Sequence, residues 1–232
     1  MGVQHLYVFR FDQRLMRLSA VEFVTGVLLA DLGVAAITTG RDFRFGHKRQ
    51  GDTDLLASLA AGHVPVSAVD PVTVAGAACS STEIRTALAD GLIERANDML
   101  GYDYELEGVV RPGDRRGRTI GFPTANVHPL GRRPMLPATG VYAVSAGLRR
   151  GRETAWRPAV ANLGRRPTFD GRSLLLEVHL LDGGGDLYGQ RLRVAFTHRL
   201  RGERKFAGID ELKAQIARDC EQARHLHALL PA

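Results

Sequence analysis

The sequence predicts two halves of different class: an α/β half, followed by a β-rich half that closes with a helix. In residues 1–102, short apolar runs alternate with amphipathic helical patterns, the order typical of parallel strands joined by crossover helices. In residues 103–232, short apolar runs separated by Gly and Pro indicate a small barrel or sandwich. Because the pattern changes near residue 102, we expect two domains, 1–102 and 103–232.

The first half is expected to alternate strands with capped helices. Strands are predicted at 5–9, 34–39 and 64–69, and helices at 19–33, 53–61, 80–91 and 92–100. Two helix starts carry the capping-box pattern, in which a serine side chain and a glutamate three residues later bond to each other's backbone amides. These pairs are Ser19 with Glu22 and Ser80 with Glu83. Gly33 and Gly91 are placed to end their helices.

The second half is expected to be built from short strands. They are predicted at 106–110, 141–148, 158–163, 174–181 and 192–196. One helix closes the chain, because apolar residues recur at helical spacing at Ile209, Leu212, Ile216, Cys220 and Ala223. Asp210 and Glu211 fall in its first turn, where the helix dipole favours negative charge.

Composition narrows the function classes. Of 232 residues, 44% are hydrophobic and 24% charged, which is a globular balance, and no apolar run approaches the roughly 18 residues of a membrane span. Cys79 and Cys220 stand far apart, so we expect no disulfide scaffold and a cytoplasmic protein. Residues 1–102 carry a net charge of −2 and residues 103–232 a net charge of +8, which indicates an anionic partner or an arginine-rich solvated surface.

The densest candidate site is the glycine-rich segment 113–126. Gly113, Gly117 and Gly121 let backbone amides approach an anion closely, and arginines stand between them. Thr124 and Asn126 lie two residues apart, so their side chains share one face of an extended segment. Their neutral oxygens suit Mg²⁺ bound also by water and nucleotide phosphates. The alternative is a basic hairpin loop in which both side chains satisfy turn amides.

Glu177 is the second candidate. Strand alternation over 174–181 places it on one face with Leu175 and His179, and a single acid in an apolar strand requires a compensating interaction. Glu177 could serve as a general base toward a hydroxyl, or it could pair with an arginine or face water. His179 is expected to pack or to form a hydrogen bond, because no second His or Cys stands at metal-ligand spacing.

Several motifs resemble the bacterial bifunctional riboflavin kinase/FMN adenylyltransferase (FAD synthetase) family. The riboflavin kinase module is matched by Gly-Phe-Pro-Thr-Ala-Asn at 121–126, Gly-Val-Tyr-Ala at 140–143, Val-Ala-Asn-Leu-Gly-Arg-Arg-Pro-Thr-Phe at 160–169, Leu-Glu-Val-His-Leu-Leu-Asp at 176–182, Asp-Leu-Tyr-Gly at 186–189 and Lys-Phe at 205–206. The adenylyltransferase module is matched by Gly-Arg-Asp-Phe-Arg-Phe-Gly at 40–46 and Ser-Ser-Thr-Glu-Ile-Arg at 80–85.

The resemblance implies an incomplete Rossmann-like nucleotidyltransferase domain followed by a six-stranded Greek-key barrel with a C-terminal helix. It implies transfer of the ATP γ-phosphate to the riboflavin 5′-hydroxyl to give FMN, with Mg²⁺ held by Thr124 and Asn126 and Glu177 as the base. The residues implied for ATP are Gly113, Asp114, Arg115, Gly117, Arg118, Gly121 and Pro123, and those implied for the flavin are Arg201, Glu203 and Phe206.

The first half departs from the family pattern. The family's Gly-x-Phe-Asp-x-x-His-x-Gly-His motif is absent, and His5, His47 and His63 stand singly. A residual adenylyltransferase site is implied at Asp42, Ser80, Ser81, Thr82 and Arg85, the serines lying at a helix N-terminus that suits anions. We therefore expect FAD synthesis to be lost or weak, residues 1–100 to be loosely folded alone, and residues 103–232 to fold independently.

Two other function classes remain open. The chain could be a flavin- or nucleotide-binding module without turnover, or an RNA-binding barrel, although few aromatic residues interleave with its arginines. The expected partners are the small molecules riboflavin and ATP, with neither nucleic acid nor membrane, and the sequence predicts no oligomeric state.

Overall fold

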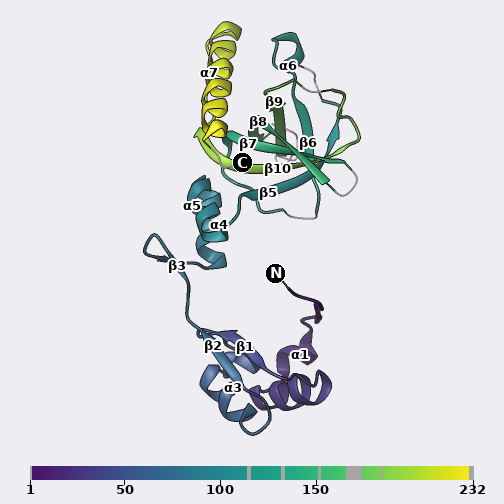
Figure 1. Cartoon of the computed structure of the whole chain (residues 1–232), viewed down its shortest axis with the longest axis vertical. Helices are drawn as coiled ribbons and strands as arrows, with labels where there is room; N and C mark the ends of the chain where they lie inside the picture. Colours follow the sequence, from purple (N-terminus) through teal and green to yellow (C-terminus); the bar gives the residue numbers. More distant parts are fainter. Residues whose placement is uncertain are drawn as a thin grey trace. The chain divides into compact units, whose positions relative to one another are not determined.

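The computed structural model describes residues 2–113, 116–131, 134–150, 153–165, 174–183 and 185–229. Two compact units make up the chain, Met1–Thr73 and Val74–Ala232, and each is described by itself (Figure 1). These units divide before the predicted boundary at residue 102, which was drawn where the sequence pattern changes. That boundary remains a prediction about where the two functional modules meet.

The first unit is a two-stranded parallel sheet with helices. Its elements are α1 (Gln13–Arg17), α2 (Ala20–Glu22), η1 (Phe23–Asp31), β1 (Ile37–Gly40), η2 (His47–Arg49), α3 (Thr53–Ala60) and β2 (Val66–Val69). β1 and β2 run parallel, with Ile37 opposite Val66, as the strand–helix–strand order predicted. The Ser19 capping box is confirmed, because Ser19 Oγ accepts from the Glu22 amide at 3.2 Å and the Ser19 amide donates to the Glu22 carboxylate at 2.8 Å.

The strand predicted at 5–9 is wrong. Residues 2–11 form neither helix nor strand, and the side chains of Leu6 and Val8 are 83% and 84% exposed. A short apolar run forms a strand only where a neighbouring strand pairs with it, and in the described part of this unit β1 and β2 pair only with each other.

The second unit is a closed antiparallel barrel of six strands, as the family resemblance implied. They are β5 (Tyr104–Arg111), β6 (Ala125–Pro129), β7 (Gly140–Arg150), β8 (Glu153–Arg165), β9 (Leu174–Leu180) and β10 (Arg191–Arg201), in the spatial order β10-β5-β6-β9-β8-β7. The strand pattern had missed β6, because its sequence Ala-Asn-Val-His-Pro alternates weakly. β6 pairs with β9 rather than with β7, its successor in the chain, and this non-sequential pairing is what places residues 126 and 177 side by side.

Before the barrel come a short hairpin and two helices, and the two helices contribute side chains to the barrel's core. They are β3 (Thr73–Val74), β4 (Ala77–Ala78), α4 (Ser81–Asp90) and α5 (Ile93–Leu100). Leu88 and Ile93 are buried in one cluster with barrel residues such as Phe196. The Ala138 amide donates to the Leu88 carbonyl at 2.8 Å, and Asn97 Nδ2 donates to the Phe196 carbonyl at 2.8 Å. The two helices are therefore fastened to the barrel by both packing and hydrogen bonds.

The capping box predicted at Ser80 is half formed. Ser80 Oγ accepts from the Glu83 amide at 3.1 Å, but the Glu83 carboxylate binds Arg95 at 3.2 Å instead of turning back to the cap.

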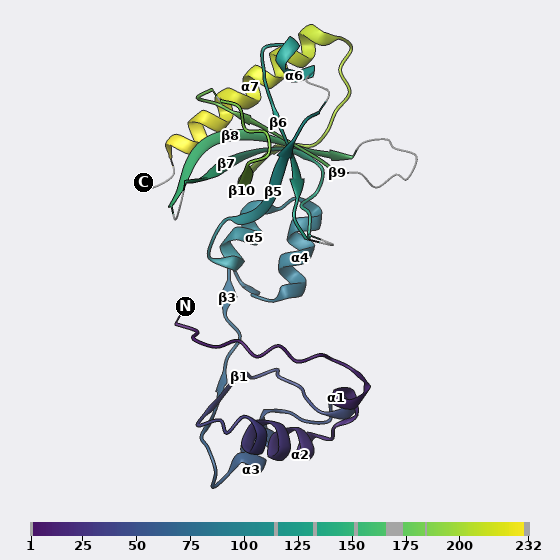
Figure 2. The same cartoon turned by 90° about the vertical axis from the view of Figure 1, so that its right-hand side faces the viewer.

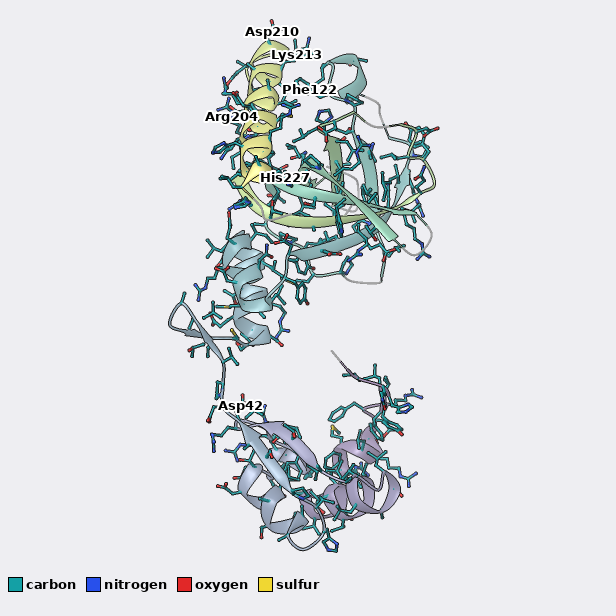
Figure 3. All side chains as sticks on the ribbon, viewed as in Figure 1. Asp42, Phe122, Arg204, Asp210, Lys213 and His227 are labelled. Atoms are coloured by element: carbon teal, nitrogen blue, oxygen red, sulfur yellow. The ribbon has the colours of Figure 1, made fainter. Side chains whose placement is uncertain are left out.

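The closing helix α7 (Ile209–Ala228) lies along the outside of the barrel, with Asp210 at one end and His227 at the other (Figures 2 and 3). Its buried face packs Cys220 and Ala223 against Val141 and Val160 of the barrel. Burial raises the pKa of the Cys220 thiol, which therefore packs as a small neutral group.

Candidate functional site

A cavity of about 660 Å³ opens between α7, the outer face of the barrel and the segment that precedes β6. The barrel strands contribute Val141, Val160, Asn162, Leu175, Glu177, His179 and Arg201, the segment before β6 contributes Gly117, Ile120, Phe122 and Thr124, and α7 with the loop before it contributes Glu203, Arg204, Phe206, Leu212, Ile216 and Asp219. The cavity combines apolar walls with a few polar groups, which is the usual construction of a small-molecule site.

Three polar side chains form a row across the adjacent strands β6, β9 and β8, and two of them, Glu177 and Asn162, line the cavity. Asn126 on β6 is directly opposite Glu177 on β9, and Glu177 is directly opposite Asn162 on β8. Directly paired residues project from the same face of a sheet, with Cβ atoms about 5 Å apart. The barrel thus brings together Asn126 and Glu177, which were predicted as separate metal and base candidates. Asn162 completes the row, and sequence analysis did not select it.

The two glycines at the start of the candidate loop make close contact with the predicted metal ligands. A Cβ at Gly113 would lie 2.3 Å from Asn126 Nδ2, and a Cβ at Gly117 would lie 2.3 Å from the Phe122 carbonyl oxygen and 3.3 Å from Thr124 Oγ1. No larger residue fits at either position without displacing these groups. Gly121 has a φ of +91°, and next to it the Phe122 amide donates to the Gly117 carbonyl at 2.8 Å, so the loop folds back on itself.

The oxygens at this position fit a hard cation. Asn126 is 7% exposed, and among the described residues nothing donates a hydrogen bond to its buried Oδ1. Burying an unpaired carbonyl oxygen is costly, so a ligand that takes up this oxygen would remove the cost. Thr124, two residues before Asn126 in the chain, supplies a hydroxyl oxygen. The described residues contain no cluster of three or more His, Cys, Asp or Glu side chains that could hold a metal. Thr124 and Asn126 both offer neutral oxygens, which suit a cation that is also bound by a substrate's phosphates.

His179 attaches the loop to β9. Its Nδ1 donates to the Pro123 carbonyl at 2.8 Å, and its ring meets the Phe122 ring edge-on with centroids 5.6 Å apart. The expectation that His179 packs or forms a hydrogen bond agrees with this geometry. Phe122 also packs beside α7, so one segment contacts both walls of the cavity (Figure 3).

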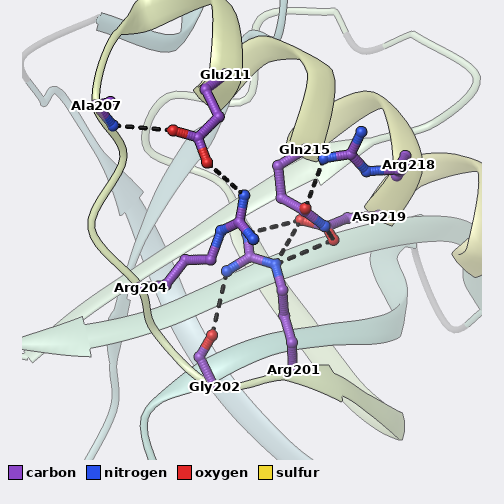
Figure 4. Close-up of polar contacts among 8 residues, drawn as sticks. All are labelled: Arg201, Gly202, Arg204, Ala207, Glu211, Gln215, Arg218 and Asp219. Carbon is purple, nitrogen blue, oxygen red and sulfur yellow. Dashed lines mark hydrogen bonds and ion pairs between the residues drawn. The ribbon is translucent and has the colours of Figure 1, made fainter.

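The opposite wall is organised by a buried carboxylate that sequence analysis did not select. Asp219 on α7 is 3% exposed, and it accepts from Arg201 Nε at 3.1 Å and Nη2 at 2.7 Å and from Gln215 Nε2 at 2.7 Å (Figure 4). Arg201, which the resemblance assigned to the flavin, thus has its guanidinium committed to α7. Asp219 was missed because an acid on an amphipathic helix ordinarily faces water.

The loop from 202 to 207 is fastened to the start of α7. Arg204 Nη2 donates to Glu211 at 2.9 Å, and the Ala207 amide donates to the same carboxylate at 2.9 Å (Figure 4). The Phe206 ring lies under the Arg204 guanidinium at 4.6 Å and near that of Arg201 at 5.7 Å. The Glu203 carboxylate packs against Gly164, where a Cβ would lie 2.6 Å from its Oε1. All three predicted flavin residues therefore line the same cavity as Glu177.

The other predicted residues belong to other parts of the chain. Asp42 belongs to the first compact unit, whereas Ser80, Ser81, Thr82 and Arg85 belong to the start of α4 in the second, where Ser80 caps the helix. Asp114 and Arg115, the side chain of Arg118 and residues 166–169 of the longest matched motif lie outside the described residues.

Comparison with known proteins matches both halves of the chain to one enzyme family. The riboflavin kinase family model matches residues 100–227, and the FAD synthetase family model matches residues 1–83. The bifunctional riboflavin kinase/FMN adenylyltransferase of Escherichia coli K12 is 44% identical over 229 residues, which cover 98% of this chain and 72% of that protein. The Bacillus subtilis protein of the same description is 37% identical, covering 96% of this chain and 70% of its own length.

A solved structure shares the fold. It is described as a macrolide-efflux protein from Streptococcus pneumoniae, and it superposes with a TM-score of 0.87 at 35% identity, covering 96% of this chain and 70% of that one. In the described part of this chain, no helix is long and apolar enough to cross a membrane. With both family models matched and relatives of 37–44% identity along nearly its whole length, the chain belongs to the bifunctional riboflavin kinase/FMN adenylyltransferase family.

Proposed function

We propose that the barrel unit transfers the γ-phosphate of ATP to the 5′-hydroxyl of riboflavin, giving FMN. The observation that carries this proposal is the pairing of Asn126 on β6 with Glu177 on β9, because Glu177 lines a cavity of about 660 Å³ together with Thr124. It places a neutral oxygen ligand and a carboxylate on one face of the sheet, with Cβ atoms about 5 Å apart, so that both can serve one phosphoryl-transfer site.

Each part of the cavity has a role in this proposal. Glu177 accepts the proton of the 5′-hydroxyl as the oxygen attacks, so it needs no raised pKa. Thr124 and Asn126 would hold Mg²⁺ together with the ATP phosphates, and the bound ion would neutralise charge on the transferring group. Gly113, Gly117 and Gly121 let the loop amides approach the nucleotide, with Asp114, Arg115, Arg118 and Pro123 assigned there by family resemblance.

The isoalloxazine ring is proposed to lie in the apolar part of the cavity. Val160, Leu212 and Ile216 supply apolar surface there. Glu203 and Phe206 line the same cavity from the loop before α7, and Arg201 shapes that loop through Asp219.

The test replaces Glu177 by Gln and Glu107, an exposed carboxylate on β5, by Gln as the matched control. Protein is mixed with riboflavin, ATP and Mg²⁺, and the flavins are separated by chromatography. We expect Glu177→Gln to lower FMN formation by about 10²–10⁴-fold while riboflavin binding persists, and Glu107→Gln to change neither. Undiminished turnover in Glu177→Gln would exclude the base assignment. Riboflavin binding without FMN formation by the unaltered chain would instead indicate a binding module.

We also propose that the 232-residue chain makes little FAD, although its family is bifunctional. The printed sequence contains no His-x-Gly-His motif, and adenylyl transfer requires the triphosphate to be held on both sides. The same chromatogram tests this, because FAD appearing at a rate similar to FMN would contradict it.

A further inference from the structure

We propose that His179 is a positioning residue, which keeps Thr124 in register with Glu177 by donating from Nδ1 to the Pro123 carbonyl. The inference rests on the proposed kinase function and adds a residue to it. His179 bonds the backbone of the segment before β6. It acts through the backbone of the segment that carries the threonine.

The bond controls the direction of Thr124 because a peptide group is planar. The Pro123 carbonyl lies in the same plane as the Thr124 amide, so a hydrogen bond of 2.8 Å to that oxygen fixes the plane from which Thr124 departs. The proline ring also fixes φ at residue 123, which leaves the segment few other ways to turn. One side-chain bond thus restrains the residue immediately before the proposed metal ligand.

The restraint is needed because Thr124 lies beyond the end of the sheet ladder. The last registered pair between β6 and β9 is Ala125 with Val178, and β6 itself begins at Ala125. His179 is the next residue along β9, on the same face as Glu177. Its side chain therefore links β9, the strand of the proposed base, to the segment just before β6, beyond the last backbone pair of the two strands.

The contact between the Phe122 and His179 rings is a second link between the segment before β6 and β9. The two rings meet edge-on at 77°, and Phe122 is packed against the apolar cluster beneath α7. A carbonyl oxygen can only accept, so Nδ1 must carry the proton, as it does in the imidazolium and in one neutral tautomer. The proposal assigns a role to Nδ1 and none to Nε2. A side chain that replaces only one of the two nitrogens therefore tests it.

The experiment compares His179→Asn, His179→Gln and His179→Phe in the full chain. The Asn amide nitrogen falls near the place of Nδ1, the Gln amide nitrogen falls near that of Nε2, and Phe keeps the ring contact with Phe122 but has no donor. We expect Asn to retain kcat within about threefold of the unaltered chain. Gln and Phe should lower kcat about 10- to 100-fold and raise the Mg²⁺ concentration for half-maximal rate, with the riboflavin KM unchanged.

A second readout does not depend on turnover. Calorimetry with ADP and Mg²⁺ should show weakened binding for Gln and Phe but not for Asn, while quenching of riboflavin fluorescence should give equal riboflavin affinities for all four proteins. Equal behaviour of Asn and Gln, whether both active or both impaired, would overturn the proposal. If Phe does not fold, the Asn–Gln pair still decides. Failure of the unaltered chain to make FMN would instead contradict the proposed function itself.

Discussion

Replacing Ile93 by Ala should destabilise the barrel, although residue 93 precedes every barrel strand. Ile93 is fully buried in the cluster that joins α4 and α5 to Leu106, Phe196 and the other barrel residues. Removing three buried carbons from such a site costs about 2–5 kcal/mol, because the cavity left behind only partly collapses. With a urea m-value of about 2 kcal/mol/M, a loss of about 3 kcal/mol lowers the unfolding midpoint by about 1.5 M.

Trp156 gives a direct assay of the barrel. It is the only tryptophan of the chain, it lies on β8, and the Arg193 guanidinium sits 4.9 Å from its ring. Urea unfolding followed by its fluorescence therefore reports the barrel and not the first unit. Leu92→Ala is the matched control, because Leu92 is 47% exposed beside Ile93 and its loss should change the midpoint little.

A midpoint for Ile93→Ala equal to that of the unaltered chain would refute the reasoning, since it would mean that α5 and the barrel unfold separately.

The same packing bears on the expectation that residues 103–232 fold independently. Without α4 and α5 the barrel would expose the surface that Leu88 and Ile93 cover, so we now expect residues 74–232, and not 103–232, to be the stable fragment.

Three further outcomes follow from named contacts. Gly113→Ala should lower FMN formation at least about tenfold, because the added methyl meets Asn126 at 2.3 Å, whereas Gly208→Ala, where nothing lies within 4 Å, should not; equal rates would contradict the close approach. Asp219→Asn should lower the free energy of unfolding by about 3 kcal/mol and raise the riboflavin KM, because it leaves the Arg201 guanidinium without its buried carboxylate, while the same change at exposed Asp182 should do neither. Burial lowers the pKa of His227 in the folded chain. Below about pH 6.5 the unfolded chain therefore binds a proton at this histidine more readily than the folded chain does, and the free energy of unfolding should fall as the pH falls. His227→Gln, which can still donate to the Val144 carbonyl, should flatten the dependence of Tm on pH between about 7.5 and 5.5, and an unchanged slope would count against this account.

Local signals in the sequence identified most helices and strands at nearly their observed places. The Ser19 capping box, α3, α7 and five of the six barrel strands follow from periodicity and from cap residues, because these depend on neighbours within a few positions. Glu177 was singled out as an acid in an apolar strand, and Thr124 and Asn126 as neutral oxygens at strand spacing. These residue types carry their chemistry wherever the fold places them.

The tertiary structure decided which of these residues meet. The strand predicted at 5–9 did not form, because no described strand pairs with it. By contrast, β6 formed although its own sequence alternates weakly, because it pairs with β5 on one side and β9 on the other. The meeting of Asn126 with Glu177 depends on the non-sequential pairing of β6 with β9, and the Arg201–Asp219 bond and the contact of His179 with Pro123 join residues far apart in the chain. Periodicity reports only which face a residue occupies, whereas long-range register determines what lies opposite that face.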